Sequence, residues 1–214
     1  MKGHIHEKQL RVLDHPVALD ALARLRHPEC KTTTFRETVR RLSRLLAVTA
    51  TDNLPSYQSE VLTPLGVHAR GHLLHGKTVL IPVLRAGLGM VEGFLDIVPN
   101  ATVGFLGLER DEKTLDPKEY YRKFPQTAEA SIFVLDPMLA TGGSACAALR
   151  SIKTTDQHYI ALVSILSAPE GIEAVHSSFP DILIITAEVD ERLDEHGFIL
   201  PGLGDAGDRL WGTE

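Results

Sequence analysis

The sequence has few of the features that mark secreted or membrane proteins. Its two cysteines, Cys30 and Cys146, form no close pair and no zinc-type spacing, so we expect no disulfide and a reducing compartment. No apolar run reaches the roughly 20 residues that span a membrane, and residues 1–10 lack the apolar stretch of a signal peptide. We therefore expect a cytoplasmic protein with no membrane partner.

An excess of basic residues is also missing. The 214 residues include 22 Lys and Arg against 28 Asp and Glu, a formal net charge of -6. Because proteins bind the phosphate backbone through clustered Lys and Arg, we expect no nucleic-acid partner. In the densest basic run, residues 36–44, the charges alternate with Val39 and Leu42 at helical spacing, which is typical of the solvated face of a core helix.

The hydrophobic content is 43%, and the length suits one domain that covers residues 1–214. We expect residues 1–60 to be an N-terminal helical part. Residues 79–187 alternate short apolar runs with helix-like stretches, which indicates an α/β core with a doubly wound, mostly parallel sheet flanked by helices.

Two helices are predicted near the N-terminus. One covers about residues 14–26, with Pro16 in its first turn. Thr34 and Glu37 have the spacing of a capping box, which predicts the start of a second helix that reaches about Ala50.

Five apolar runs in the core are predicted strands, and they lack polar alternation because both faces of each strand are buried. They are residues 79–84, 102–108, 132–135, 160–166 and 182–187. The helix-like stretches between them are residues 90–97, 144–153 and 169–176. Ser167 is a candidate cap for the last of these helices.

Two segments do not fit this alternation. Residues 111–126 are polar with Tyr120 and Tyr121, and we expect a protruding arm there. Residues 190–214 are rich in glycine, which permits backbone shapes that other residues resist. We expect this closing stretch to be a functional loop and tail.

The most informative junction is residues 132–144, since ligands of open α/β sheets bind at the carboxyl ends of strands. An apolar strand ends on Asp136, and a glycine-containing turn then opens a helix. The N–H groups of such a turn favour a phosphate, Thr141 and Ser144 can add hydroxyl donors, and Asp136 can accept hydrogen bonds from ribose hydroxyls. An ordinary tight connection between a strand and a helix is the alternative.

Residues 136–144, Asp-Pro-Met-Leu-Ala-Thr-Gly-Gly-Ser, resemble the phosphoribosyl-pyrophosphate (PRPP) motif of uracil phosphoribosyltransferases. The resemblance extends over most of the chain, with further motifs at residues 84–90, 110–112, 120–121, 168–173 and 201–209. It implies a phosphoribosyltransferase fold and an enzyme that joins uracil N1 to the phosphoribosyl group of PRPP, which yields UMP and pyrophosphate. A phosphoribosyltransferase for another base and a non-catalytic PRPP-binding regulator are the alternatives.

The resemblance also implies the residues that bind PRPP. They are Arg85, Arg110, Asp136, Pro137, Met138, Leu139, Ala140, Thr141, Gly142, Gly143, Ser144 and Asp205. Arg85, Arg110, Asp136 and Asp205 are the expected catalytic residues among them. An arginine fork at a strand end also suits pyrophosphate on physical grounds, with a simple surface charge as the alternative. Glu109 stands where the family has Tyr, so the resemblance assigns that position no role.

For uracil, the resemblance implies Ile199, Gly204, Asp205 and Ala206 in a base-binding loop, largely through main-chain groups. Uracil presents a fixed acceptor-donor-acceptor edge that backbone N–H and C=O groups can match rigidly. The exocyclic amine of cytosine would meet a donor instead, which disfavours that base.

The resemblance further implies magnesium as the PRPP complex, a homo-oligomer of two or more subunits, and GTP as an activator of some members. Related enzymes carry two adjacent acids at this strand end, whereas here Pro137 follows Asp136. We therefore expect no metal tightly bound by protein side chains.

Three other patterns are set aside. Residues 71–78 match a nucleotide P-loop, but the predicted strand follows the glycines instead of preceding them. Residues 202–207 match a dinucleotide fingerprint with no βαβ unit behind it. His68, His72 and His75 could share a helix face and bind metal, but flanking glycines and the lack of a carboxylate favour a solvated segment.

Overall fold

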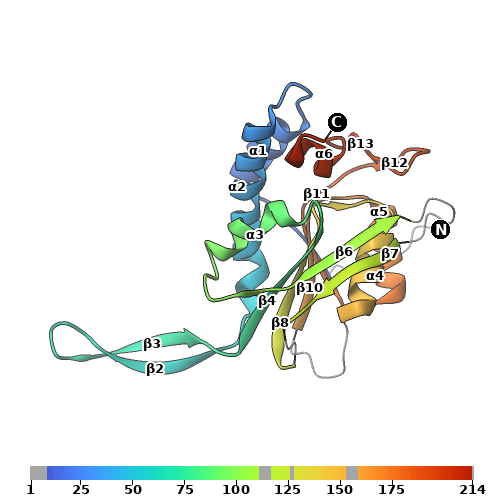
Figure 1. The fold of residues 1–214 in the computed structure, drawn as a ribbon. Helices are drawn as coiled ribbons and strands as arrows, with labels where there is room; N and C mark the ends of the chain where they lie inside the picture. The colour runs from blue at the N-terminus through green and yellow to red at the C-terminus, as the bar shows by residue number, and fades with distance from the viewer. Residues whose placement is uncertain (1–8, 111–116, 126–127, 153–158, 214) are drawn as a thin grey trace.

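A computed structural model describes residues 9–110, 117–125, 128–152 and 159–213. Helices cover both faces of a central sheet, and a long hairpin projects from one side of this body (Figure 1). The expected α/β architecture, with a doubly wound and mostly parallel sheet, is confirmed.

The main sheet has the strand order β1-β11-β10-β8-β4-β6-β7. In this order the strands are β1 (Leu10–Val12), β11 (Leu183–Val189), β10 (Tyr159–Ser167), β8 (Ala130–Leu135), β4 (Lys77–Leu84), β6 (Phe105–Arg110) and β7 (Pro117–Lys123). Two short strands join its edges, β5 (Thr102–Val103) beside β4 and β9 (Met138–Leu139) beside β10. Among the described strands of this sheet, only β6 and β7 pair in antiparallel fashion.

The strands at the centre are buried on both faces, as their unbroken apolar runs predict. On one face they pack against α1 (Pro16–Arg26), α2 (Thr32–Ala50) and α3 (Leu88–Leu95), and on the other against α4 (Gly143–Ile152) and α5 (Pro169–Ser178). A short 3-10 turn, η1 (Thr51–Asn53), ends α2. The apolar stripe of α2 is buried, and Arg40 and Arg44 on its outer side pair with Asp96.

Two predicted caps are wrong. The helix α2 begins two residues before Thr34, and its N-cap Lys31 makes no side-chain capping bond. Thr34 therefore lies inside the first turn, where its carbonyl accepts the hydroxyl of Thr38 at 2.7 Å. The N-cap of α5 is Ala168, because the buried side chain of Ser167 points into the sheet and donates to the Thr186 hydroxyl at 3.0 Å.

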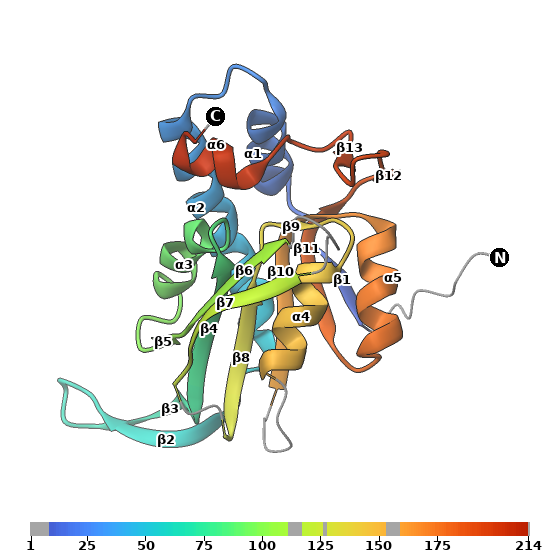
Figure 2. The same cartoon turned by 45° about the vertical axis from the view of Figure 1, so that its right-hand side comes forward.

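The predicted N-terminal helical part at residues 1–60 contains α1 and α2, but it also contains strands. It contains β1 and most of β2 (Ser56–Leu62), which forms an antiparallel hairpin with β3 (His68–Leu74). This hairpin, the β2–β3 arm, extends away from the body in both views (Figures 1 and 2). Residues 71–78 therefore run from β3 into β4 without a helix, which confirms that they form no P-loop.

The predicted protruding arm at residues 111–126 lies partly outside the described residues. Its described part contains β7, which adds an antiparallel edge strand to β6 and so belongs to the sheet. The element that projects is the β2–β3 arm instead (Figure 1).

The closing stretch passes over the carboxyl end of the sheet. The strands β12 (Arg192–Leu193) and β13 (Ile199–Leu200) pair with each other, and α6 (Ala206–Trp211) then packs on α2. Figure 2 shows α6 beside α1 and α2 at the top of the molecule. Residues from the two ends of the chain therefore meet above the sheet.

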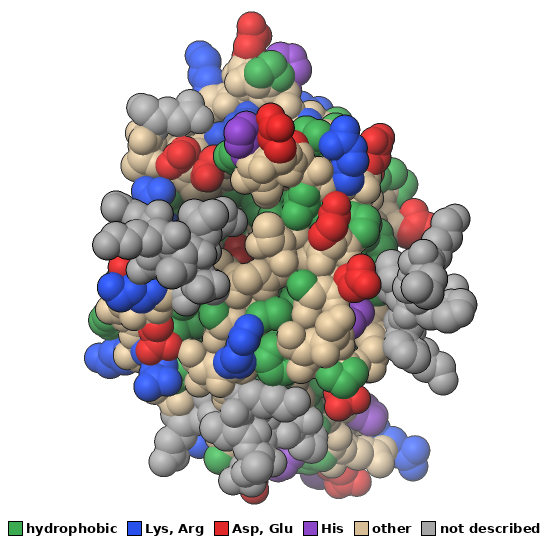
Figure 3. All heavy atoms as spheres, turned by 90° about the vertical axis from the view of Figure 1, so that its right-hand side faces the viewer, with side chains coloured by type: hydrophobic (Ala, Val, Ile, Leu, Met, Phe, Trp, Pro, Cys, Tyr) green, Lys and Arg blue, Asp and Glu red, His purple; other side chains and the backbone are tan. Residues whose placement is uncertain are grey.

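Among the described residues, no helix is long and apolar enough to span a bilayer. On the face that Figure 3 shows, described acidic and basic side chains are interspersed, and Lys and Arg do not gather there into one patch.

Candidate active site

A cavity of about 190 Å³ brings the separate sequence motifs together at the carboxyl end of the sheet. The turn after β8 contributes Asp136, Met138 and Ala140, and the loop after β4 contributes Ala86. The closing stretch lines the rest with Gly197, Phe198, Ile199, Gly204, Asp205, Ala206 and Gly207. Segments that lie more than 100 residues apart in the chain, such as Ala86 and Ala206, thus enclose one space.

The turn between β8 and α4 has the shape of an anion cradle. Gly142 has a φ of 81°, in the left-handed region that favours glycine. The helix α4 begins at the next residue, so its first N–H groups lie at the positive end of the helix dipole. Thr141 is exposed and its hydroxyl lies 3.4 Å from the N–H of Gly143. The turn can therefore offer backbone N–H groups and a hydroxyl to one phosphate.

Asp136 sits at the start of this turn. Its backbone N–H donates to the carbonyl of Val163 at 3.1 Å, which ties the turn to β10. Burial raises the pKa of the Asp136 carboxyl to about 7, although the hydrogen bond from the Met138 N–H lowers it. Near neutral pH the carboxyl therefore exchanges between a neutral form and an anion that accepts hydrogen bonds.

Arg85 follows β4 directly and extends toward the closing stretch. Its side chain is 58% exposed, and its Nη2 lies 3.3 Å from Oδ1 of Asp208 in α6. Its Nη1 lies 3.4 Å from the hydroxyl of Thr213. Asp208 was not among the predicted site residues. Its place in the motif at 201–209 was the sequence signal that could have identified it.

Arg110 is the last residue of β6 and stands opposite Pro117 of β7. Its backbone reaches the carboxyl edge of the sheet, while its side chain lies outside the described part of the structure. Glu109 is exposed and stands opposite Lys118. The structure therefore places Arg110 on the strand next to the one that leads to Arg85.

Tyr120 covers the neighbouring glycine of β6. A Cβ built on Gly107 would lie 2.5 Å from Cζ of Tyr120, so the ring rests directly on the backbone there. Gly107 pairs with Leu84, the residue before Arg85. A register shift between Gly107 and Leu108 produces this placement.

In the closing stretch, Ile199 and Ala206 are buried, whereas Gly204 and Asp205 are exposed. Asp205 is the N-cap of α6, and its Oδ1 accepts the N–H of Asp208 at 2.9 Å. A Cβ on Gly207 would lie 3.8 Å from both Ala86 and the Arg85 guanidinium. The closing stretch therefore rests against the loop after β4.

Gly171 of α5 packs against the turn that follows Asp136. It lies in the motif at 168–173, although it was not among the predicted site residues. A Cβ at this position would lie 2.4 Å from the carbonyl oxygen of Ala140 and 2.8 Å from that of Leu139. Both are backbone atoms of the cradle, so neither can rotate away. Only glycine lets α5 approach the turn this closely.

We therefore expect Gly171→Ala to weaken PRPP binding and to lower stability by about 1–3 kcal/mol, the usual cost of overpacking. Glu173→Ala on the exposed side of the same helix is the matched control. Calorimetric PRPP titration and thermal denaturation measure the two effects. Unchanged PRPP affinity in Gly171→Ala would contradict the support that α5 gives to the turn.

Magnesium would need oxygen ligands at this cavity. In the described ranges, no three His, Cys, Asp or Glu side chains cluster in a way that could hold a metal ion. Asp136 and Asp205 both line the cavity, and carboxylates of this kind suit an ion that also keeps phosphate and water ligands.

Comparison with known proteins agrees with these features. The profile of the uracil phosphoribosyltransferase family matches residues 12–213. The uracil phosphoribosyltransferase of Dictyoglomus turgidum is 50% identical over 205 residues, which are 95% of this chain and 99% of that protein. The enzyme of that name from Thermoanaerobacter sp. is 48% identical over 209 residues, 97% of this chain and 99% of that protein.

Solved structures extend the likeness to the fold. The AQ2163 protein from Aquifex aeolicus superposes with a TM-score of 0.91 at 37% identity, over 96% of this chain and 99% of that chain. A hypoxanthine-guanine phosphoribosyltransferase from Bacillus anthracis shares the fold at a TM-score of 0.52 and 12% identity, over 74% of this chain and 80% of that chain. The chain therefore belongs to the uracil phosphoribosyltransferase family.

Proposed function

We propose that the cavity binds PRPP and uracil together and transfers the phosphoribosyl group to uracil N1, which yields UMP and pyrophosphate. The observation that carries the proposal is the meeting of three segments around one cavity. These are the turn after Asp136, the loop that carries Arg85, and the closing stretch from Ile199 to Ala206.

The 5-phosphate of PRPP lies in the turn of residues 140–144, where the start of α4 supplies N–H groups and a favourable dipole. The Asp136 carboxylate accepts the ribose hydroxyls beside it. Arg85 binds the pyrophosphate. Because pyrophosphate carries more negative charge than the single carboxylate of Asp208, it replaces Asp208 as the partner of the Arg85 guanidinium. Arg110 approaches the pyrophosphate from the adjacent strand.

Uracil lies against the main chain of Ile199, Gly204 and Ala206, in line with the anomeric carbon. The carbon–oxygen bond to pyrophosphate breaks as the bond to N1 forms, and the N1 proton is released. Positive charge develops on the sugar and negative charge on the leaving group. The arginines stabilise the latter, and the cavity holds the two reactants in line.

Bound as the PRPP complex, magnesium would supply neutralisation of the pyrophosphate charge. Asp205 is the side chain placed to contact the sugar or this ion, in addition to its role as the cap of α6. We propose that the free protein binds magnesium weakly. Calorimetry with magnesium alone should show no tight site, and strong binding without PRPP would contradict this.

The proposed reaction is tested by a panel of bases. Purified protein is mixed with magnesium, PRPP and, in separate reactions, uracil, cytosine, hypoxanthine and guanine. We expect UMP from uracil and no nucleotide from the others. Turnover with another base but not uracil would favour a different phosphoribosyltransferase, and PRPP binding without any turnover would favour a regulator.

We further propose that the β2–β3 arm joins two copies of this chain. The register pairs Tyr57 with Leu73 and Val61 with Ala69, which places these four side chains on one face of the hairpin. Tyr57, Val61 and Leu73 are 49%, 47% and 45% exposed. An isolated two-stranded hairpin is marginal in water, so an apolar face of this kind needs a cover.

The second copy is the occupant that the surface of the body favours. Val48 on α2, Leu88 on α3 and Ile97 just after it are exposed apolar side chains, and α3 lies on the side from which the arm projects (Figures 1 and 2). A two-fold dimer lets each arm cover exposed apolar side chains of the other subunit.

We expect Val61→Asp to convert the dimer into monomers, as measured by light scattering after size-exclusion chromatography. Gln58→Asp adds the same charge to the opposite face of the hairpin, at a polar position paired with His72, and should leave the dimer intact. A wild-type monomer at micromolar concentration, or equal dissociation in both variants, would contradict the proposed contact.

We propose a cytoplasmic location, supported by the free thiols of Cys30 and Cys146, which suit a reducing compartment.

We also propose GTP as an activator, supported by the family resemblance alone. Initial rates of UMP formation at increasing GTP concentration test this, and identical rates would exclude activation.

A further inference from the structure

The turn at Gly202 connects β13 to the residues that line the cavity, and an ion pair holds both of its backbone polar groups. Nη1 of Arg26, the last residue of α1, donates to the Gly202 carbonyl at 2.8 Å. Oδ2 of Asp190 accepts the Gly202 N–H, also at 2.8 Å. Arg26 and Asp190 bind each other through two further contacts of 2.6 and 2.8 Å. The backbone N–H and C=O of Gly202 are thus both held by this ion pair.

The backbone conformation of Gly202 couples this residue to Ile199. Its φ is 65°, and a Cβ there would lie 2.0 Å from the carbonyl oxygen of Ile199. The turn therefore folds tightly back on Ile199, and two residues later the chain reaches Gly204. Because Ile199 and Gly204 both line the cavity, a shift of this turn would move backbone groups that line it.

The ion pair itself is shielded from water. The Asp190 side chain is only 2% exposed and that of Arg26 is 22% exposed. Although burial raises the pKa of Asp190, the hydrogen bonds from Arg26 and Gly202 lower it by more, so the carboxyl stays ionised. Buried, bidentate pairs of this kind hold their geometry more firmly than exposed ones.

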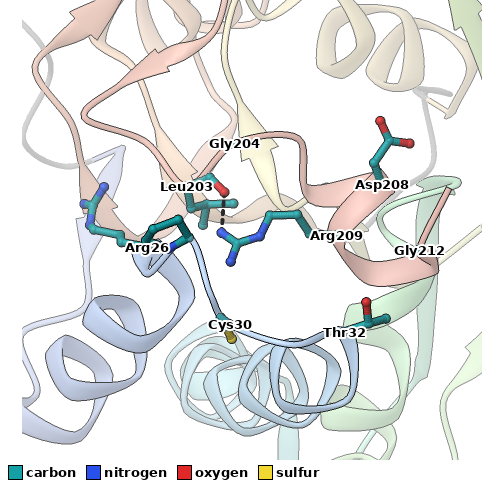
Figure 4. A pocket seen from close by; sticks show the side chains of 9 residues that line it. Arg26, Cys30, Thr32, Leu203, Gly204, Asp208, Arg209 and Gly212 are labelled. Atoms are coloured by element: carbon teal, nitrogen blue, oxygen red, sulfur yellow. Dashed lines mark hydrogen bonds between the residues drawn. The ribbon is translucent and has the colours of Figure 1, made fainter. Parts of the chain in front are cut away.

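A second arginine ties the next residue of the loop to the same helix end (Figure 4). Nη1 of Arg209 donates to the Leu203 carbonyl at 2.7 Å and also to that of Leu25. Its Nη2 donates to the His27 carbonyl at 2.7 Å, and its guanidinium lies 4.5 Å from the centre of the Phe35 ring. The carbonyls of Gly202 and Leu203 are therefore both anchored to the end of α1.

We propose that Arg26 and Asp190 are positioning residues that set the affinity for uracil by fixing the backbone at Gly202. This inference rests on the proposed function, in which main-chain groups of Ile199, Gly204 and Ala206 bind the base. Hydrogen bonds weaken steeply when distance and angle change, so a displaced loop loses affinity for uracil. The turn after Asp136 shares none of these contacts, and Asp205 is held by its own capping bond to Asp208, so PRPP binding should change less than uracil binding.

The test is Arg26→Lys, which keeps a positive charge beside Asp190 but lacks the fork that binds Asp190 and Gly202 together. We expect KM for uracil to rise roughly 10-fold, about the effect of one weakened hydrogen bond, while kcat stays unchanged and KM for PRPP changes much less. Arg24→Lys on the same helix, where Arg24 pairs with Asp20 at the surface, is the matched control and should change none of the three.

A purely structural role would lower the melting temperature and leave KM for uracil unchanged, or raise both KM values alike. Either result overturns the inference. If Arg26→Lys does not fold, the neutral pair Arg26→Gln with Asp190→Asn is measured by the same criteria, because it removes both charges and keeps polar groups next to Gly202. Wild-type protein that forms no UMP would instead refute the proposed function.

Discussion

Replacing Arg85 with alanine is expected to lower kcat/KM for PRPP by about 10²–10³-fold, the usual effect of removing a donor aimed at transition-state charge. The protein should stay folded. The Arg85 side chain is 58% exposed, and its ion pair with Asp208 has the character of a surface pair. Such pairs contribute only about 0–1 kcal/mol to stability.

Initial rates at varied PRPP concentration measure the loss, and circular dichroism measures the fold. Arg44→Ala is the matched control, because Arg44 is also exposed and paired with an aspartate, Asp96, but lies on α2 away from the cavity. We expect full activity from this control. Wild-type turnover of PRPP by Arg85→Ala would remove the pyrophosphate role from this residue.

The second large effect concerns the ionisation of Asp136. Because burial raises the pKa of its carboxyl to about 7, PRPP affinity should increase as the pH rises from 6 to 8 and the anion forms. Asp136→Asn should flatten this dependence and bind PRPP roughly 10–100-fold more weakly at pH 8, the loss of hydrogen bonds to a charged group. Calorimetric PRPP titrations across this range measure both.

The stability of the fold should change in the opposite direction. The folded protein holds the Asp136 proton more tightly than the unfolded chain, whose pKa is near 3.8. The resulting stabilisation is complete below that pH and is lost as the pH rises through about 7. At pH 8, Asp136→Asn should therefore melt at a higher temperature than the wild type.

PRPP phosphates themselves titrate near pH 6, and this contribution remains in the asparagine variant. The difference between the two proteins isolates Asp136. An equally steep pH dependence in both would show that the carboxyl does not govern binding.

The central strands could be predicted from the sequence, because a strand that is buried on both faces is an unbroken apolar run. Such a run can be recognised without knowing which strands lie beside it. The strand β8 and the start of α4 are of this kind. The β2–β3 arm could not be predicted in this way. Its apolar side chains, among them Tyr57 and Val61, stay about half exposed, so its pattern does not match a core strand.

The candidate site divides similarly. Asp136 and Arg85 each stand one residue beyond a strand, where the topology of the sheet alone places them at the binding edge. Asp208, Arg26 and Gly171 reach the site through tertiary contacts. No local pattern indicates that an arginine at the end of α1 will bind a carbonyl 176 residues later in the chain.

The most direct test of this account is a crystal structure of the protein with UMP bound. We expect the phosphate on the N–H groups of residues 140–144, the ribose hydroxyls on the Asp136 carboxyl, and the uracil edge on the backbone of Ile199, Gly204 and Ala206. A nucleotide whose phosphate lies outside the turn after Asp136, or whose base contacts none of the closing stretch, would contradict the site described above.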